Sequence, residues 1–191
     1  ASQLPLPTGP AILNDKILDD RLATEGAPQT AFVVVVPLSN LSTQRYLIEM
    51  AAFIARHEKG YVVPLAIAPA HAHMDDPKLL TALTHHHQLL QTAQTISEAV
   101  GTEARPQIRI DDDIANGISR AAREHHAQLV VMGRSQTEGL RARLLGNVID
   151  NVFWASHCPV AVTRLKKAPI ELKRILIPVK IMTPQTIRTI R

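Results

Sequence analysis

The chain has 191 residues, of which 46% are hydrophobic and 3% aromatic, and a formal net charge of +4 at pH 7. This length is typical of one domain with some chain left over, and the composition favours aliphatic helices packed on a sheet over a β-sandwich. The single cysteine, Cys158, excludes an internal disulfide and fits a reducing compartment. The sequence has neither an apolar run near the ~20 residues of a membrane span nor a signal-peptide pattern, so we expect a soluble, cytoplasmic chain.

The positive charge is concentrated at the C-terminal end. From Arg164 onward, eight basic residues face one acidic residue, Glu171, a surplus of seven; subtracting seven from +4 leaves −3 for residues 1–163. Nucleic-acid binding needs a basic stripe on the folded body, with aromatic side chains for a single strand, so we expect no nucleic-acid partner. The basic tail is interpreted as a solvated linker, with a membrane-surface contact as the alternative.

Residues 1–30 are rich in Pro, Gly and polar residues, and they are interpreted as a lead-in linker with one short amphipathic helix. Five apolar segments then alternate with four segments of helical periodicity. The predicted strands are 31–37, 61–68, 106–110, 129–132 and 158–164, and the predicted helices are 42–57, 79–100, one from 114 and 147–156.

This alternation predicts an α/β fold, a doubly wound, Rossmann-like parallel sheet of five strands with helices on both faces. Pro64 inside the second strand removes a ladder hydrogen bond and indicates a bulge or irregular pairing.

Two groups of polar residues are candidates for a reactive site. The acids Asp111, Asp112 and Asp113 could form a magnesium or catalytic cluster, but an N-cap with acids at a helix start is the favoured interpretation. Histidines recur at 71, 73 and 85–87, near Asp75 and Asp76, yet no pair has zinc-like spacing with a third ligand. We therefore expect solvated histidines and no structural metal.

The segment from Val130 to Val152 carries the strongest functional signal. Gly133 ends a buried strand and brings bare backbone to whatever lies beyond it. Asn147 after Gly146 predicts a helix N-terminus there, whose free N–H groups suit a phosphate, and a plain strand–loop–helix connection is the alternative. Ligands of such sheets bind where strand order reverses, so Gly133 and Ser39 would line one pocket if their strands are neighbours.

The stretch from Phe32 to Leu165 resembles the universal stress protein family. The resemblance rests on the five-strand alternation, the start VVVVP and the segment LVVMGRSQTEGLRARLLGNVIDNVFWASHCPVAVTRL. ATP-binding members carry a glycine, two residues, a glycine, nine residues, then glycine and Ser or Thr. Gly133 and Gly146 match the first and third glycines, Gln136 and Asn147 replace the second glycine and the hydroxyl residue, and Ser39 replaces the acid after the first strand.

This resemblance implies a homodimer and an adenine-nucleotide site, for ATP or AMP with magnesium, or for a cyclic dinucleotide. It implies that the adenosine side is lined by Pro37, Ser39 and Ile67. It implies that the phosphate side is lined by Met132, Gly133, Gln136, Gly146, Asn147 and Val148.

The segment after Arg174, ILIPVKIMTP, repeats the start of the domain at an offset of 141 residues when Pro178 is aligned with Pro37. Residues 31–165 are therefore interpreted as one domain, 166–171 as a linker and 172–191 as the start of an incomplete second copy. The chain is also similar to the cytosolic tails of cyanobacterial-type cation/proton antiporters. That similarity implies a fused or associated membrane transporter, with this domain on the cytosolic side.

These patterns support three functions. The favoured one is a non-enzymatic regulatory domain that senses a nucleotide. The second is an interaction module with a degenerate pocket that dimerises along the last strand. The third, a hydrolase or phosphotransferase, would need a base and a metal ligand at the pocket rim, and the chain has no Walker-type lysine motif, so we expect no enzyme.

Overall fold

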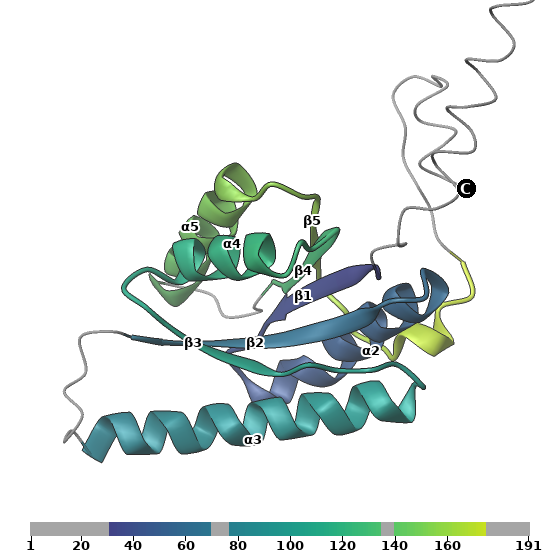
Figure 1. Ribbon diagram of the computed structural model, residues 1–191, viewed down its shortest axis with the longest axis horizontal. Helices are drawn as coiled ribbons and strands as arrows, with labels where there is room; N and C mark the ends of the chain where they lie inside the picture. The colour runs from purple at the N-terminus through teal and green to yellow at the C-terminus, as the bar shows by residue number, and fades with distance from the viewer. Residues whose placement is uncertain (1–30, 70–76, 135–139, 175–191) are drawn as a thin grey trace, which may run out of the picture. The chain divides into compact units, whose positions relative to one another are not determined.

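The computed structural model describes residues 31–69, 77–134 and 140–174, and these residues form one five-stranded parallel sheet with helices on both of its faces (Figure 1). The strand order is β3-β2-β1-β4-β5. The strands are β1 (Val33–Pro37), β2 (Tyr61–Pro69), β3 (Gln107–Asp111), β4 (Leu129–Gly133) and β5 (Val160–Thr163). The helices are α2 (Leu41–His57), α3 (Pro77–Ala99), α4 (Ile114–Glu124), α5 (Leu140–Ala155) and the 3-10 turn η1 (Pro169–Glu171).

The two faces of the sheet carry separate cores. Helices α2 and α3 cover one face and α4 and α5 cover the other (Figure 1). Along β1, Val34 and Val36 pack into the first core, whereas Val33 and Val35 pack into the second. A strand buried on both faces has no polar side to present, which explains its uninterrupted apolar sequence. The predicted doubly wound fold is confirmed.

Strand β2 accommodates Pro64 without a bulge. Its pairing with β1 is continuous, from Val33 opposite Tyr61 to Pro37 opposite Leu65. On the other side, the bonds of Val62 to Glu103 and Arg105 show that the missing N–H of Pro64 faces β3. The ladder is interrupted there, between the isolated bridge at Val62 and the regular pairing that resumes at Leu65. The pairing is irregular as predicted, but only toward β3.

Helix α5 begins earlier than the sequence indicated. We predicted its start at Asn147, but it begins at Leu140, so Gly146 and Asn147 lie inside it. The sequence LRARLL consists of strong helix formers, and one interior glycine costs only about 1 kcal/mol. The prediction of a helix N-terminus at Asn147 is therefore wrong.

Several predicted features lie outside the described residues. They are the lead-in helix within 1–30, the histidine and aspartate loop at 71–76, Gln136, and most of the repeated segment, from 175 onward. Residues 166–171, predicted as a linker, include η1, which packs against α2.

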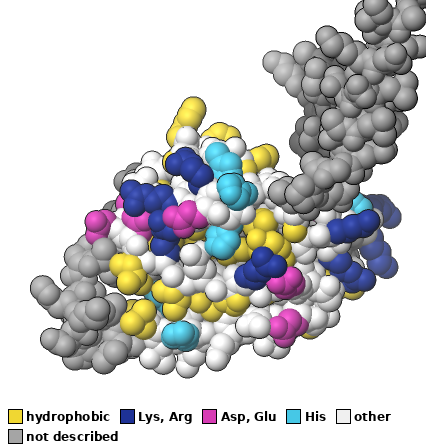
Figure 2. Space-filling model, viewed as in Figure 1, with side chains coloured by type: hydrophobic (Ala, Val, Ile, Leu, Met, Phe, Trp, Pro, Cys, Tyr) yellow, Lys and Arg dark blue, Asp and Glu magenta, His cyan; other side chains and the backbone are white. Residues whose placement is uncertain are grey.

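Charge is unevenly spread over the surface. Figure 2 shows Lys and Arg side chains gathered at its right-hand edge, the side on which Figure 1 draws η1. Lys166, Lys167 and Lys173 flank η1, and all three are exposed. In the described parts of the chain, no helix is both long enough and apolar enough to cross a membrane.

Candidate functional site

Strand order reverses between β1 and β4, and we call the region outside the carboxyl ends of these two strands the crevice. These strands pair directly, with Val34 opposite Leu129 and Val35 opposite Val130. When this β1–β4 register is extended toward the carboxyl ends of the strands, Pro37 lies opposite Met132 and Leu38 lies opposite Gly133. In a doubly wound sheet, ligands bind outside the carboxyl ends of the strands at this reversal.

Five of the nine predicted site residues gather at this end of the sheet: Pro37, Ser39, Ile67, Met132 and Gly133. The β1–β2 register, extended from Pro37 opposite Leu65, brings Ser39 level with Ile67. Ser39 and Gly133 are exposed, whereas Met132 is buried. This end of the sheet therefore offers an exposed polar side chain at Ser39 and exposed backbone at Gly133, next to the buried side chain of Met132.

One wall of the crevice is the start of α2. Leu38 and Leu47 are buried in the core beneath this helix. A Cβ built on Gly133 would lie 3.4 Å from Leu47 Cδ2, an ordinary van der Waals distance. The fold itself therefore tolerates a small side chain at Gly133, and the glycine is not needed there for packing.

The opposite wall is apolar and belongs to the second core, against which Ile67 and Val148 pack. Helix α4 comes close to this wall through Gly117, because a Cβ there would meet Ile67 Cδ1 at 3.0 Å and Asp111 Cβ at 3.1 Å. From the sequence we did not single out Gly117. A glycine within the helical segment IANGIS does, however, indicate that the helix backbone lies close to a neighbouring element.

The rest of the predicted phosphate side is only partly described. Gln136 lies outside the described residues, and Gly146 and Asn147 occupy the interior of α5. The backbone N–H of Arg134 donates to Thr163 O at 2.8 Å and is therefore committed to the sheet. Helix α5 starts at Leu140 and not at Asn147, and it is at a helix start that backbone N–H groups lack partners within the helix.

The acid triplet follows β3, an edge strand that is separated from β1 by β2. Asp113 is the N-cap of α4, and its carboxylate accepts from Asn116 N at 2.8 Å. The N-cap interpretation is confirmed.

Asp111 is nearly buried and is held by cations. Its carboxylate accepts from Arg109 Nε at 3.4 Å and from an Arg120 guanidinium nitrogen at 3.3 Å. Burial alone would raise the pKa of Asp111, but the backbone N–H of Asp113 and the two guanidinium groups outweigh burial and lower that pKa. The negative charge of Asp111 is therefore balanced by two arginines, and its carboxylate is a poor candidate for a metal ligand.

The histidines at 85–87 point in different directions from α3. His85 and His87 are exposed, whereas His86 is half-buried and its Nδ1 has no hydrogen-bond partner. Burial, followed by the neighbouring His85 and His87, lowers the pKa of His86. Within residues 31–69, 77–134 and 140–174, no three His, Cys, Asp or Glu side chains are grouped to hold a metal ion.

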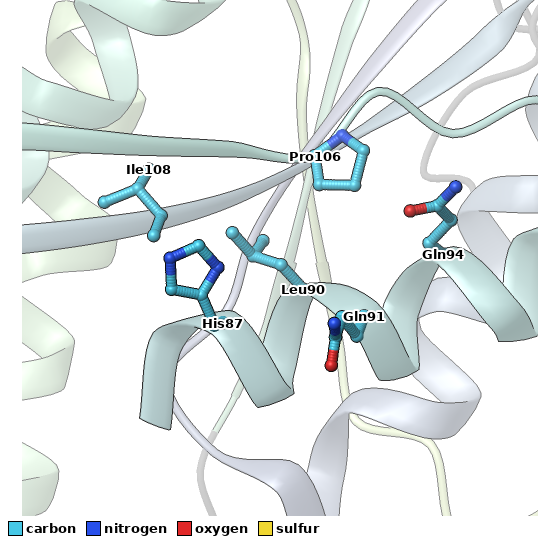
Figure 3. A pocket seen from close by; sticks show the side chains of 6 residues that line it. All are labelled: His87, Leu90, Gln91, Gln94, Pro106 and Ile108. Carbon is cyan, nitrogen blue, oxygen red and sulfur yellow. The ribbon is translucent and has the colours of Figure 1, made fainter. Parts of the chain in front are cut away.

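A shallow groove of roughly 350 Å³ lies elsewhere, between α3 and the β3 edge (Figure 3). His87 and Leu90 of α3 point toward Ile108 and Pro106, and Gln91 and Gln94 continue the lining (Figure 3). The groove is open and carries no Asp, Glu, Lys or Arg in its lining. It is separate from the crevice at β1 and β4.

The fold and the crevice define a doubly wound α/β protein of the kind that binds ligands at the strand-order reversal. The universal stress protein family matches residues 32–164, and the chain belongs to this family.

Individual relatives agree with this assignment. The chain is 48% identical over 192 residues to a protein of Synechocystis named Na+/H+ antiporter NhaS5, covering 98% of this chain but only 28% of that protein. It is also 31% identical over 80 residues to a universal stress protein of Methanocaldococcus jannaschii, covering 42% of this chain and 46% of that protein. The predicted similarity to antiporters is thus found over nearly the whole chain, which spans just over a quarter of the antiporter's length.

Solved structures share the fold at low sequence identity. A universal stress protein of Archaeoglobus fulgidus in complex with dAMP aligns with a TM-score of 0.57 and 19% identity, covering 70% of this chain and 98% of that one. A universal stress protein in complex with cAMP aligns with a TM-score of 0.54 and 20% identity, covering 71% and 98%.

Proposed function

We propose that this domain is a non-enzymatic sensor of an adenine nucleotide and that it regulates a Na+/H+ antiporter to which it is fused or bound. The observation that carries the nucleotide site is the crevice between β1 and β4, where Ser39 and Gly133 face solvent above Met132. Two structures of this fold are described as complexes with dAMP and cAMP, which supports an adenine nucleotide as the ligand.

The transporter partner is supported by the relative named Na+/H+ antiporter, of which this chain corresponds to about a quarter. In this proposal, residues 31–165 form the sensor on the cytosolic side of the membrane, 166–171 connect it to the next segment, and 172–191 begin a second copy. A ligand regulates a partner only if it binds one arrangement of the domain more tightly than another. The crevice suits this role because its two walls come from opposite faces of the sheet.

The absence of an enzymatic role is part of the proposal. The described carboxylates near the strand ends already have structural partners, since Asp113 caps α4 and Asp111 is held by Arg109 and Arg120. A hydrolase would need an unpaired base at the crevice rim. The nucleotide would be ATP, AMP or a cyclic dinucleotide, with magnesium carried by its phosphates.

Calorimetric titration of the full 191-residue chain with ATP, AMP and cyclic di-AMP, with and without magnesium, tests the site. We expect saturable binding of one of them, lost in Gly133→Trp because the indole would fill the crevice. Ala99→Trp, at the exposed end of α3, is the matched control and should bind as wild type does. Absence of binding by the folded wild-type protein would contradict the proposal.

A second candidate function, a dimerisation module, is favoured by the apolar surface next to β5. Trp154 is 84% exposed, Phe153 60% and Val162, on the edge strand itself, 42%. Large exposed apolar side chains on an edge strand and its neighbouring helix are typical of a protein–protein contact. This function does not need the crevice, so Gly133→Trp would leave it unchanged.

A further inference from the structure

Gln44 is a buried amide without a hydrogen-bond partner. Its side chain is 1% exposed, and in the described part of the chain neither Oε1 nor Nε2 has a partner. Among the other buried polar groups, the Thr102 hydroxyl donates to Ala52 O at 3.0 Å and that of Ser119 to Ala115 O at 2.9 Å, whereas the buried Ser97 hydroxyl also lacks a partner. Because buried polar groups are nearly always hydrogen-bonded, an amide that leaves both atoms unpaired needs an explanation.

The position of Gln44 on α2 gives that explanation. Helix α2 starts at the carboxyl end of β1 and runs back along the sheet (Figure 1). Leu47 lies on its inward face beside Gly133, the last residue of β4. Gln44 precedes Leu47 by one turn on the same face, which sets it about 4.5 Å further along the helix axis, beyond the strand ends. Helical side chains also tilt toward the N-terminus, so the amide extends toward the crevice.

The chemistry of the amide selects a part of the ligand. An amide offers one acceptor and two donors in a plane and carries no charge. It is buried on the same helix as Leu47, a member of the first core, and at a buried position a phosphate would lose its hydration without gaining a cation. A flat, neutral ring edge with a donor beside an acceptor fits this environment, and adenine presents that pattern at its 6-amino group and adjacent ring nitrogen.

We propose that Gln44 is the base-recognition residue of the crevice and that its amide pairs with the 6-amino edge of adenine. This inference rests on the proposed nucleotide site and names the group that selects the base.

The replacement Gln44→Met separates this role from a structural one, because methionine keeps the length of the side chain and its helix propensity but has no amide. Removing an unpaired buried amide should raise the melting temperature of the ligand-free protein by roughly 2–6 °C. The same replacement should weaken AMP binding at least about tenfold, since two hydrogen bonds are lost. Gln88→Met, on the exposed side of α3, is the matched control and should change neither quantity.

A comparison of two ligands tests the atom assignment. Purine riboside 5′-monophosphate differs from AMP only in lacking the 6-amino group. Wild type should prefer AMP by about five- to tenfold, and Gln44→Met should bind both ligands equally, as in a double-mutant cycle.

Equal AMP affinity of Gln44→Met and wild type would overturn this inference and leave the nucleotide site standing. Equal weakening of both ligands would show that Gln44 only shapes the crevice, and would also overturn it. No binding of AMP by the wild-type protein would reject the inference together with an AMP site.

Discussion

A contact between the residue after α4 and the first residue of β3 couples the fold to pH. His125 follows α4, and its Nε2 lies 2.9 Å from Gln107 Oε1 of β3. Burial lowers the pKa of His125; Glu124 partly opposes this, and Arg105 lowers the pKa further. The neutral ring is therefore the form that the folded protein prefers.

This shift predicts acid sensitivity well above the range where carboxylates titrate. With a folded pKa below 6.5, the unfolded chain takes up the proton first, so the stabilisation is complete above pH 6.5 and is lost as pH falls through the folded value. The free energy of unfolding in urea should therefore decrease between pH 7.5 and 5.5, and the decrease should be smaller in His125→Gln. His157→Gln, exposed in the loop before β5, should keep the wild-type dependence. An identical pH dependence in His125→Gln and wild type would contradict this assignment.

At the scale of elements, α4 depends on its cap. The Asp113 carboxylate takes up an N–H that the helix leaves unpaired, 2.8 Å from Asn116 N. Asp113→Ala should lower the free energy of unfolding by about 1 kcal/mol, measured by urea denaturation, whereas Asp113→Ser retains a capping oxygen and should cost a few tenths. If both variants unfolded like the wild type, the cap would not contribute to stability.

The cap also matters for the position of α4 against the sheet. Gly117, one turn after Asp113, brings the helix against Ile67 and Asp111. The acid triplet thus anchors the helix that supports one wall of the crevice, and its described carboxylates serve the fold because Asp113 caps α4 and Asp111 is held by Arg109 and Arg120.

At the scale of the whole molecule, the two edges of the sheet differ in their surroundings. The β5 edge carries the exposed Val162, and the last turn of α5 carries the exposed aromatic pair Phe153 and Trp154, whose rings are 6.2 Å apart. The β3 edge carries Ile110, which is 68% exposed, next to the charged residues Arg109 and Asp111. Apolar side chains on an edge strand favour pairing with another chain, whereas charged side chains discourage it.

This difference predicts which edge forms a homodimer. Sedimentation of the full chain at micromolar concentrations should give a dimer for the wild type and a monomer for Val162→Glu, because a buried carboxylate at the interface would lack a partner. Ile110→Glu places the same charge on the opposite edge and should remain dimeric. A monomeric wild type, or dissociation caused by Ile110→Glu alone, would contradict a dimer through β5.

Much of the architecture could be predicted from local sequence alone. An all-valine strand between turns, helices with apolar periodicity and strict alternation leave a parallel sheet covered on both faces as the consistent arrangement, because each apolar face must be buried. Asp113 as a cap and Gly133 at a strand end were equally visible, since both depend on the neighbouring residues of one turn.

Other features required the tertiary structure. The start of α5 was mispredicted at Asn147 because helix propensity upstream outweighed a glycine and a capping residue, a balance that motif spacing does not reveal. The pairing of β1 with β4, which creates the crevice, joins segments 95 residues apart in sequence. From the sequence we could say only that Gly133 and Ser39 would line one pocket if these strands were neighbours. In the sequence, Gln44 is an ordinary polar residue near a helix start, and only packing shows that its amide is buried and has no hydrogen-bond partner. Local sequence determined the elements of this protein, and the long-range contacts decided where they meet, because burial is a property of all the neighbours in space and not of the residue alone.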